Sequence, residues 1–119
     1  MRSVILTGIR PPLMRDKLNS QRCSKFLRAL ADPERLKIIQ CLGPGPLTVG
    51  EISARLNSPL ANVSHHLKQL RIAGVVVGRK RGRQVHYEVA GRVAATTGQG
   101  RKALDVLDFG CCRLELGQK

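Results

Sequence analysis

The sequence from Ser58 to Val89, SPLANVSHHLKQLRIAGVVVGRKRGRQVHYEV, joins a helical pattern directly to a strand pattern. Ser58 is a residue type that caps helix N-termini, and Pro59 suits the first helical position, where its fixed φ and missing N–H cost nothing. Gly74 is a natural residue for the left-handed conformation that ends a helix. The apolar residues between them recur at the spacing of one buried helix face, and they are Val63, Leu67 and Leu70. An amphipathic helix is therefore expected to start at Ser58 and end near Gly74.

The opposite face of this helix carries polar side chains and no acid. At helical spacing it presents Asn62, His65, Lys68 and Gln69. All of these side chains end in hydrogen-bonding groups. The face is therefore available to the base edges and phosphates of a nucleic acid.

After Gly74 the pattern changes from helical to alternating. An apolar run covers Val75 to Val77, and further on Val85, Tyr87 and Val89 alternate with polar residues. Two facing strands are expected. Between them lies the sequence Arg79-Lys80-Arg81-Gly82-Arg83, in which the glycine supplies the positive φ of a tight turn. The pattern predicts a β-hairpin with a strongly cationic tip.

Positive charge is concentrated around the same stretch. The chain has 21 Lys and Arg against 8 Asp and Glu, a formal net charge of +13. More than half of that net charge lies between residues 55 and 92, where Glu88 is the single acid. The expected partner is a polyanion. A basic surface that only aids solubility, or one that binds an anionic membrane, is the alternative.

The length and composition of the chain further limit its fold, its nucleic-acid partner and its location. A chain of 119 residues suits one domain with a modest core. Three aromatic residues leave little material for stacking the bases of single strands, which favours duplex DNA. No segment approaches the roughly 20 apolar residues of a membrane span, and the patch at residues 4–6 is too short for a signal peptide. The protein is therefore expected in the cytoplasm. There its four cysteines should be reduced thiols.

The preceding sequence supplies three more helices. An apolar stripe predicts the first from Leu18 to Ala31, and Asp32-Pro33 caps a second that ends at Leu42. Thr48-x-x-Glu51 is a capping box for a short third helix that ends near Asn57. Because almost no linker follows, the third and fourth helices form a helix-turn-helix, and the hairpin becomes its wing. The predicted fold is mainly α with a small antiparallel β-hairpin: a single winged helix-turn-helix domain.

Five sequence segments resemble the ArsR/SmtB family of winged-helix repressors over roughly residues 20–90. They are FLRALADPERLKI (26–38), LTVGEI (47–52), VSHHLKQL (63–70), AGVV (73–76) and GRQVHY (82–87). In that family a homodimer, joined through its first and last helices, binds an inverted repeat and is released by a metal, a metalloid or thiol oxidation. The resemblance implies the same partners here: operator DNA and a second copy of the chain.

The docking mode implies two groups of DNA-contacting residues. Those expected on and around the major groove are Ser58, Asn62, Ser64, His65, Lys68 and Gln69. Those expected on phosphates or in the minor groove are Arg79, Lys80, Arg81 and Arg83. His66 adjoins the buried Leu67 and is interpreted as structural.

The family's known sensor sites are largely missing. Its Cys-x-Cys arsenic site falls where this chain has Thr48 and Gly50, and the zinc site of its last helix lacks its histidines here. A vicinal pair, Cys111-Cys112, remains near the C-terminus. The resemblance implies that such a pair, with Cys23 as a third ligand, would hold a thiophilic ion: As(III), Sb(III), Cd(II), Hg(II) or Cu(I). No cofactor is expected to be required for folding. Cys41 is interpreted as a small core hydrophobe.

The C-terminal segment fits the family least well. The resemblance implies a last helix from about Val93 to Leu107, but the sequence at 96–100, TTGQG, is poor helix material. Residues 108–116 can be helix, strand or loop. In a strand, Cys111 and Cys112 would point to opposite faces unless Gly110 introduces a kink.

The resulting domain plan has three parts: a flexible basic arm at 1–16, the DNA-binding domain at 17–92, and a dimerisation and sensor segment at 93–119. Met14 is an alternative start. The expected function is a transcriptional repressor that responds to a thiophilic metal or metalloid. The alternatives are a thiol redox-responsive repressor, a cysteine pair with no sensing role, and a DNA-binding architectural protein or protein-interaction module. No catalytic constellation is found, so an enzyme is not expected.

Overall fold

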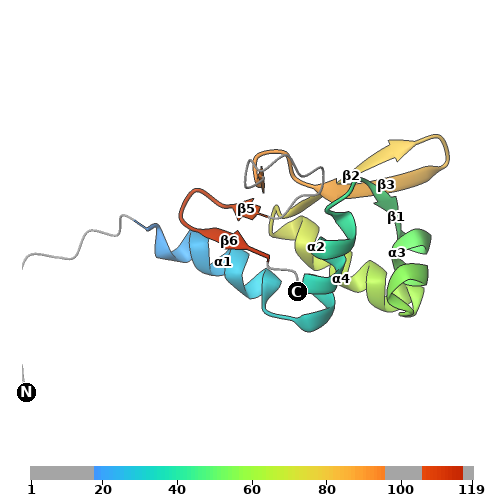
Figure 1. Ribbon diagram of the computed structural model, residues 1–119, viewed down its shortest axis with the longest axis horizontal. Coiled ribbons are helices and arrows are strands. Elements are labelled where there is room, and N and C mark those ends of the chain that lie inside the picture. The colour runs from blue at the N-terminus through green and yellow to red at the C-terminus, as the bar shows by residue number, and fades with distance from the viewer. Residues whose placement is uncertain (1–17, 96–105, 117–119) are drawn as a thin grey trace, which may run out of the picture.

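Four helices and two small antiparallel sheets make up the part of the chain that the computed structural model describes, residues 18–95 and 106–116 (Figure 1). The helices are α1 (Ser20–Leu30), α2 (Pro33–Leu42), α3 (Val49–Leu56) and α4 (Leu60–Ile72). The first sheet contains β1 (Leu47–Thr48), β2 (Val76–Arg81) and β3 (Gln84–Val89), and the second contains β4 (Ala94–Ala95), β5 (Val106–Asp108) and β6 (Arg113–Glu115). The proposed arm at 1–16 and Met14 lie outside the described residues.

Several helix ends are where the sequence predicts them. A carboxylate oxygen of Asp32 accepts hydrogen bonds from the backbone N–H groups of Glu34 and Arg35, at 2.8 and 3.2 Å. Thr48 and Glu51 form both hydrogen bonds of the capping box. Gly74 has a φ of +83°, the left-handed value expected after a helix. Local caps therefore fix the helical frame.

The start of α4 differs from the prediction. The helix begins at Leu60, Pro59 occupies the N-cap position, and no side chain caps it. Ser58 belongs to the preceding turn instead: its N–H donates to the Ser53 carbonyl at 3.1 Å, and its own carbonyl accepts from the Ser53 hydroxyl. The expected Ser58 cap is wrong because this serine closes α3. The helix-turn-helix itself is confirmed, with Asn57 in the left-handed region at the turn.

The first sheet has the strand order β1-β3-β2. Its hairpin is longer than predicted, because Arg79, Lys80 and Arg81 belong to β2 and only Gly82 and Arg83 form the turn. Gly82 has the expected positive φ, +63°. The pairing of β1 with β3, which places Leu47 opposite Tyr87, was not predicted because a two-residue strand leaves almost no periodic signal.

The second sheet overturns the expected last helix. Ala94–Ala95 and Val106–Asp108 are paired antiparallel strands, while residues 96–105 between them lie outside the described residues. Of the alternatives for 108–116, strand and loop are confirmed: β5 and β6 form a hairpin through residues 109–112. The sheet joins the core through Leu107 and Val93, which are buried, and through a hydrogen bond from the Asp108 N–H to the Val93 carbonyl at 2.8 Å.

The core is aliphatic, as expected, except for one aromatic pair. Phe26 of α1 and Phe109 of the second hairpin stack with ring centroids 4.5 Å apart. No polar or charged residue is buried among the described residues. None of the helices in that part of the chain is long and apolar enough to cross a membrane. The stacked pair shows that the N-terminal helix and the C-terminal hairpin share one core.

Candidate nucleic-acid interface and thiol cluster

The middle of the solvent-facing side of α4 is polar, as predicted, whereas Leu60 and Ile72 at the two ends of the helix are exposed apolar residues. Asn62, Ser64, His65 and Lys68 are all exposed. Gln69 is half-buried and faces a cleft between α4 and α1, which is also lined by Lys25, Arg28 and Arg35. Gln69 is thus less accessible to a nucleic acid than its helical neighbours are.

The cations of the hairpin project from both of its faces. Arg79, Lys80, Arg81 and Arg83 are exposed, and the turn at Gly82 is open, since a Cβ atom added there would meet nothing within 4 Å. Arg79 differs from the others because its Nε lies 3.0 Å from the Oε1 atom of Glu88. Its charge is therefore partly satisfied within the chain, whereas no ion pair holds Lys80, Arg81 or Arg83 among the described residues.

His66 connects α4 to α2. Its Nδ1 accepts a hydrogen bond from Arg35 Nε at 3.2 Å, and Arg35 also donates to the Ala29 carbonyl at 3.2 Å. Burial opposes the ionisation of Asp32, but the backbone N–H groups of Arg35 and Glu34, together with the nearby guanidinium of Arg35, hold the pKa of that carboxyl below its ordinary value. These contacts agree with the structural interpretation of His66.

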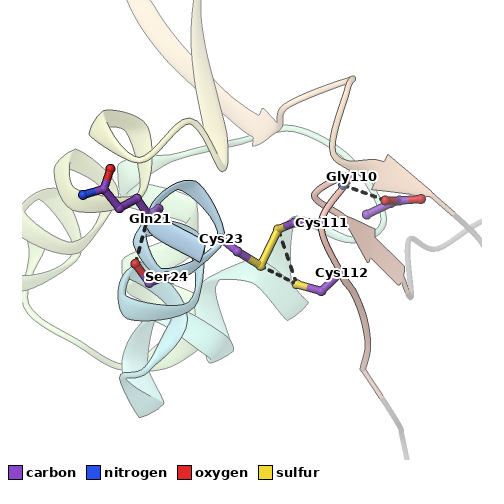
Figure 2. Close-up of a disulfide and its surroundings, with 7 residues drawn as sticks. Gln21, Cys23, Ser24, Gly110, Cys111 and Cys112 are labelled. Carbon is purple, nitrogen blue, oxygen red and sulfur yellow. Dashed lines mark hydrogen bonds between the residues drawn. A yellow bond between two sulfur atoms is a disulfide. The ribbon is translucent and has the colours of Figure 1, made fainter. Parts of the chain in front are cut away.

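Three cysteines from opposite ends of the sequence meet where α1 contacts the second hairpin (Figure 2). Their sulfur atoms all lie within 4.8 Å of one another. Cys23 and Cys111 form a disulfide with their Cα atoms 5.9 Å apart. The Cys112 sulfur lies 3.3 Å from that of Cys23 and 3.9 Å from that of Cys111. We call Cys23, Cys111 and Cys112 the thiol cluster.

The disulfide corrects one expectation and the cluster supports another. The prediction that all four cysteines are reduced thiols is wrong for Cys23 and Cys111, because the fold holds their sulfur atoms at bonding distance. The prediction that Cys23 joins the vicinal pair is confirmed as a matter of position. Ion binding by the three residues stays a prediction.

The hairpin loop explains how adjacent cysteines converge. Gly110 has a φ of +84°, and its N–H donates to a carboxylate oxygen of Asp108 at 2.9 Å. The Phe109 N–H donates to the Cys112 carbonyl at 2.9 Å and closes the loop. Because Cys111 and Cys112 lie in this loop rather than in a strand, their side chains are not forced to opposite faces. Gly110 therefore supplies the kink that the sequence suggested.

Cys41 stands apart from the thiol cluster. It packs, half-buried, against the core, and burial raises the pKa of its thiol although Arg55 opposes the rise. A raised pKa lowers the thiolate fraction and with it the reactivity. These observations agree with a structural cysteine.

The residues that hold the two candidate sites in place were not identified from the sequence. Arg35, which orients His66, and Phe109, which holds the loop against α1, carry no local motif. The only available signals were the position of Phe109 beside the Gly110-Cys111-Cys112 run and the spacing of Arg35 in the family-like segment.

Comparison with known proteins gives consistent results. A family model described as a helix-turn-helix domain matches residues 30–79. The HTH-type transcriptional regulator CmtR of Mycobacterium tuberculosis is 46% identical over 74 residues, which are 62% of this chain and 63% of CmtR, so the match spans less than two thirds of that relative. The regulator NmtR of M. tuberculosis is 36% identical over 80 residues, 67% of each chain.

A solved structure shares the arrangement of these elements. The homodimeric winged helix-turn-helix DNA-binding domain Mb0332 of Mycobacterium bovis aligns with a TM-score of 0.60 and 26% identity. The alignment covers 69% of this chain and 78% of that one.

Proposed function

Because the chain belongs to the ArsR/SmtB family of winged helix-turn-helix transcriptional regulators, we propose that it is a repressor whose hold on operator DNA is released by a thiophilic ion. The repressor acts as a homodimer on an inverted repeat. The observation that carries the sensor assignment is the thiol cluster, with three sulfur atoms inside 4.8 Å. The family consists of DNA-binding regulators rather than enzymes.

The DNA-reading part of the proposal uses α4 and the hairpin. Exposed Asn62, Ser64, His65 and Lys68 read base edges in the major groove, with Gln69 and Ser58 at the margins of the contact. The wing cations contact phosphates or the minor groove and supply affinity that is independent of sequence. Most of this sequence-independent affinity comes from Lys80, Arg81 and Arg83, because Glu88 partly neutralises Arg79.

The donor set fits a soft ion. Three thiolates without a carboxylate or imidazole among them match the preference of As(III), Sb(III) and related ions for sulfur. Binding requires the reduced cluster, because a disulfide sulfur of Cys23 or Cys111 has no thiolate to offer. A bound ion would pin the C-terminal hairpin to α1, and only about 1–3 kcal/mol of coupling is needed to shift operator affinity roughly 5- to 150-fold.

A redox-responsive repressor is the second candidate, and the Cys23–Cys111 disulfide favours it. In that case a peroxide, as electron acceptor, oxidises one thiol to a sulfenic acid, and the second thiol displaces water to form the disulfide. Formation of this bond, rather than capture of an ion, would change DNA affinity.

A DNA titration of cysteine variants separates the two candidates. Reduced protein is bound to its own upstream DNA and challenged with As(III), Sb(III), Cd(II) and hydrogen peroxide in turn. Cys112→Ser should lose release by the ions but keep release by peroxide if redox sensing operates, because Cys23 and Cys111 can still pair. Cys23→Ser should lose both responses, because Cys23 lies within reach of both other sulfur atoms, and Cys41→Ser is the matched control that should lose neither.

Contrary results are equally clear. Release by As(III) from the Cys111→Ser/Cys112→Ser variant would place the sensor elsewhere. Equal affinity for unrelated duplexes would indicate an architectural DNA-binding protein instead of a repressor.

A further inference from the structure

Strand β6 lies at the edge of the second sheet. In the strand order β4-β5-β6 it pairs only with β5 among the described residues (Figure 1). An edge strand presents unpaired backbone N–H and C=O groups to any strand that can match them. Both Arg113 and Glu115 are exposed, while Leu114 between them is half-buried against the core.

The register of the hairpin shows which backbone groups face outward. The hydrogen bond from Phe109 N–H to the Cys112 carbonyl makes these two a bonded pair. Bonded and non-bonded pairs alternate along an antiparallel ladder. Leu107 and Leu114 are therefore the next bonded pair, and the N–H and C=O groups of Arg113 and Glu115 point away from β5.

We propose that β6 is the dimerisation edge, pairing antiparallel with β6 of a second copy around Leu114 to give one continuous six-stranded sheet. In this register Arg113 of each copy lies opposite Glu115 of the other, and the outward N–H and C=O groups match each other. The interface is the same patch on both subunits, as a twofold axis requires. The inference rests on the homodimer of the proposed function.

Side-chain charge selects this register and this partner. Opposite charges directly across an antiparallel pair are favourable, and like charges are unfavourable. Glu115 has no ion-pair partner within the described part of its own chain. Arg113 has one, Asp108 at 3.7 Å, but both side chains are substantially exposed, at 62% and 45%, and such surface pairs contribute little. Both residues are therefore free to pair across the axis.

The surrounding surface supports an interface at this place. A pair of three-residue strands is small for a stable dimer. Helix α1, which contacts the same hairpin through the thiol cluster, exposes Leu27, and Leu18 just before the helix is exposed as well, each at 49%. These are exposed apolar side chains on or next to the helix against which the hairpin packs. Cys112 directly precedes Arg113, so the same hairpin carries both the sensor and the dimer contact.

A charge-swap cycle tests the pairing. Sedimentation equilibrium of the full chain measures the dimer Kd for wild type, Arg113→Glu, Glu115→Arg and the double variant. Each single swap turns two symmetric attractions into repulsions and should raise the Kd about tenfold. The double variant restores opposite charges and should return to within about threefold of wild type. Asp108→Asn removes the charge that pairs with Arg113 within the chain but keeps an oxygen that can accept the Gly110 N–H. It is the control and should leave the Kd unchanged.

A backbone variant tests the same edge without charge. Glu115→Pro removes an outward N–H while leaving the β5 pairing, so it should give a monomer with the thermal unfolding midpoint of a wild-type monomer at high dilution. If the swaps leave the Kd of a wild-type dimer unchanged, the inference is overturned and another surface forms the dimer. If wild type is monomeric at every concentration, the homodimer of the proposed function is overturned with it.

Discussion

The two sheets of the molecule present opposite kinds of chemistry at opposite ends (Figure 1). The β2–β3 hairpin carries exposed guanidinium and ammonium groups, while the loop of the β5–β6 hairpin carries a disulfide sulfur and a free thiol that lie against α1. The cations of the first hairpin suit contact with a polyanion, whereas cysteine sulfur is the kind of group that thiol oxidation or a soft ion modifies. Under the proposed function, recognition and response would therefore belong to separate hairpins.

The connection between the two hairpins is short and packed. The Ala90 N–H donates to the Val75 carbonyl at 2.9 Å at the base of the first hairpin, and Val93 holds Asp108 of the second. Ala90 and Val93 are both buried in the common core. Buried residues and backbone hydrogen bonds therefore connect the bases of the two hairpins.

Removing the Cys23–Cys111 disulfide should have the largest effect on stability. The disulfide joins residues 88 positions apart, and the chain-entropy model gives about 4.5 kcal/mol for a loop of that length. Reduction, or Cys23→Ser, should lower the free energy of unfolding by up to that amount, as measured by urea denaturation. Cys41→Ser under the same conditions provides the comparison. If Cys23→Ser and Cys41→Ser lost equal free energy of unfolding, core packing and not the disulfide would be responsible.

Removing charge from the β2–β3 hairpin should alter DNA binding without affecting the Cys23–Cys111 disulfide. Arg81→Ala removes one phosphate contact from each subunit of the dimer and should reduce the slope of log K against log salt by about 1.8, roughly 0.9 per contact. Arg79→Ala should change the slope less, because Glu88 already holds Arg79 at 3.0 Å. Fluorescence anisotropy at several salt concentrations measures both slopes. The assignment of Arg79 as a partly neutralised residue would be wrong if the two variants behaved alike.

The smallest effect is expected at the cap between α1 and α2. The folded pKa of Asp32 lies below its ordinary value of 3.8, so the unfolded state binds the proton more readily. Its contribution is present above that value and is lost as the pH falls through the lower, folded pKa. Stability between about pH 5 and 2 should therefore decline less steeply in Asp32→Asn than in wild type. Matching acid unfolding curves for the two proteins would argue against this role.

The DNA-reading half could be predicted because its determinants are local. The Thr48-Glu51 capping box, the Asp32 cap and Gly74 each act within a few residues, and all three are confirmed. Even there, Ser58 was misassigned, because a serine can cap the helix that follows or close the one before it. Here Ser58 closes α3, because the Ser53 hydroxyl donates a hydrogen bond to the Ser58 carbonyl. The geometry of the turn sets this contact, and the identity of residue 58 does not reveal it.

The thiol half could be predicted only in part because it is assembled from distant residues. A resemblance suggested that Cys23 would meet Cys111 and Cys112, and the structure brings them together. The family's last helix misled the prediction for Ala94–Ala95 and Val106–Asp108. Strands this short are stabilised by pairing with one another and by the contact of Phe109 with Phe26, and neither is visible as a period in the sequence.

The sequence separation of Cys23 and Cys111 also determines the delay between their synthesis on the ribosome. Cys111 lies 88 positions after Cys23, so at about 5–20 residues per second the ribosome reaches it roughly 4–18 s later. For that interval Cys23 is present without Cys111 or Cys112. A nascent chain therefore offers oxidants and soft ions only one thiol of the cluster, and the three-sulfur chemistry begins only when the second hairpin has been made.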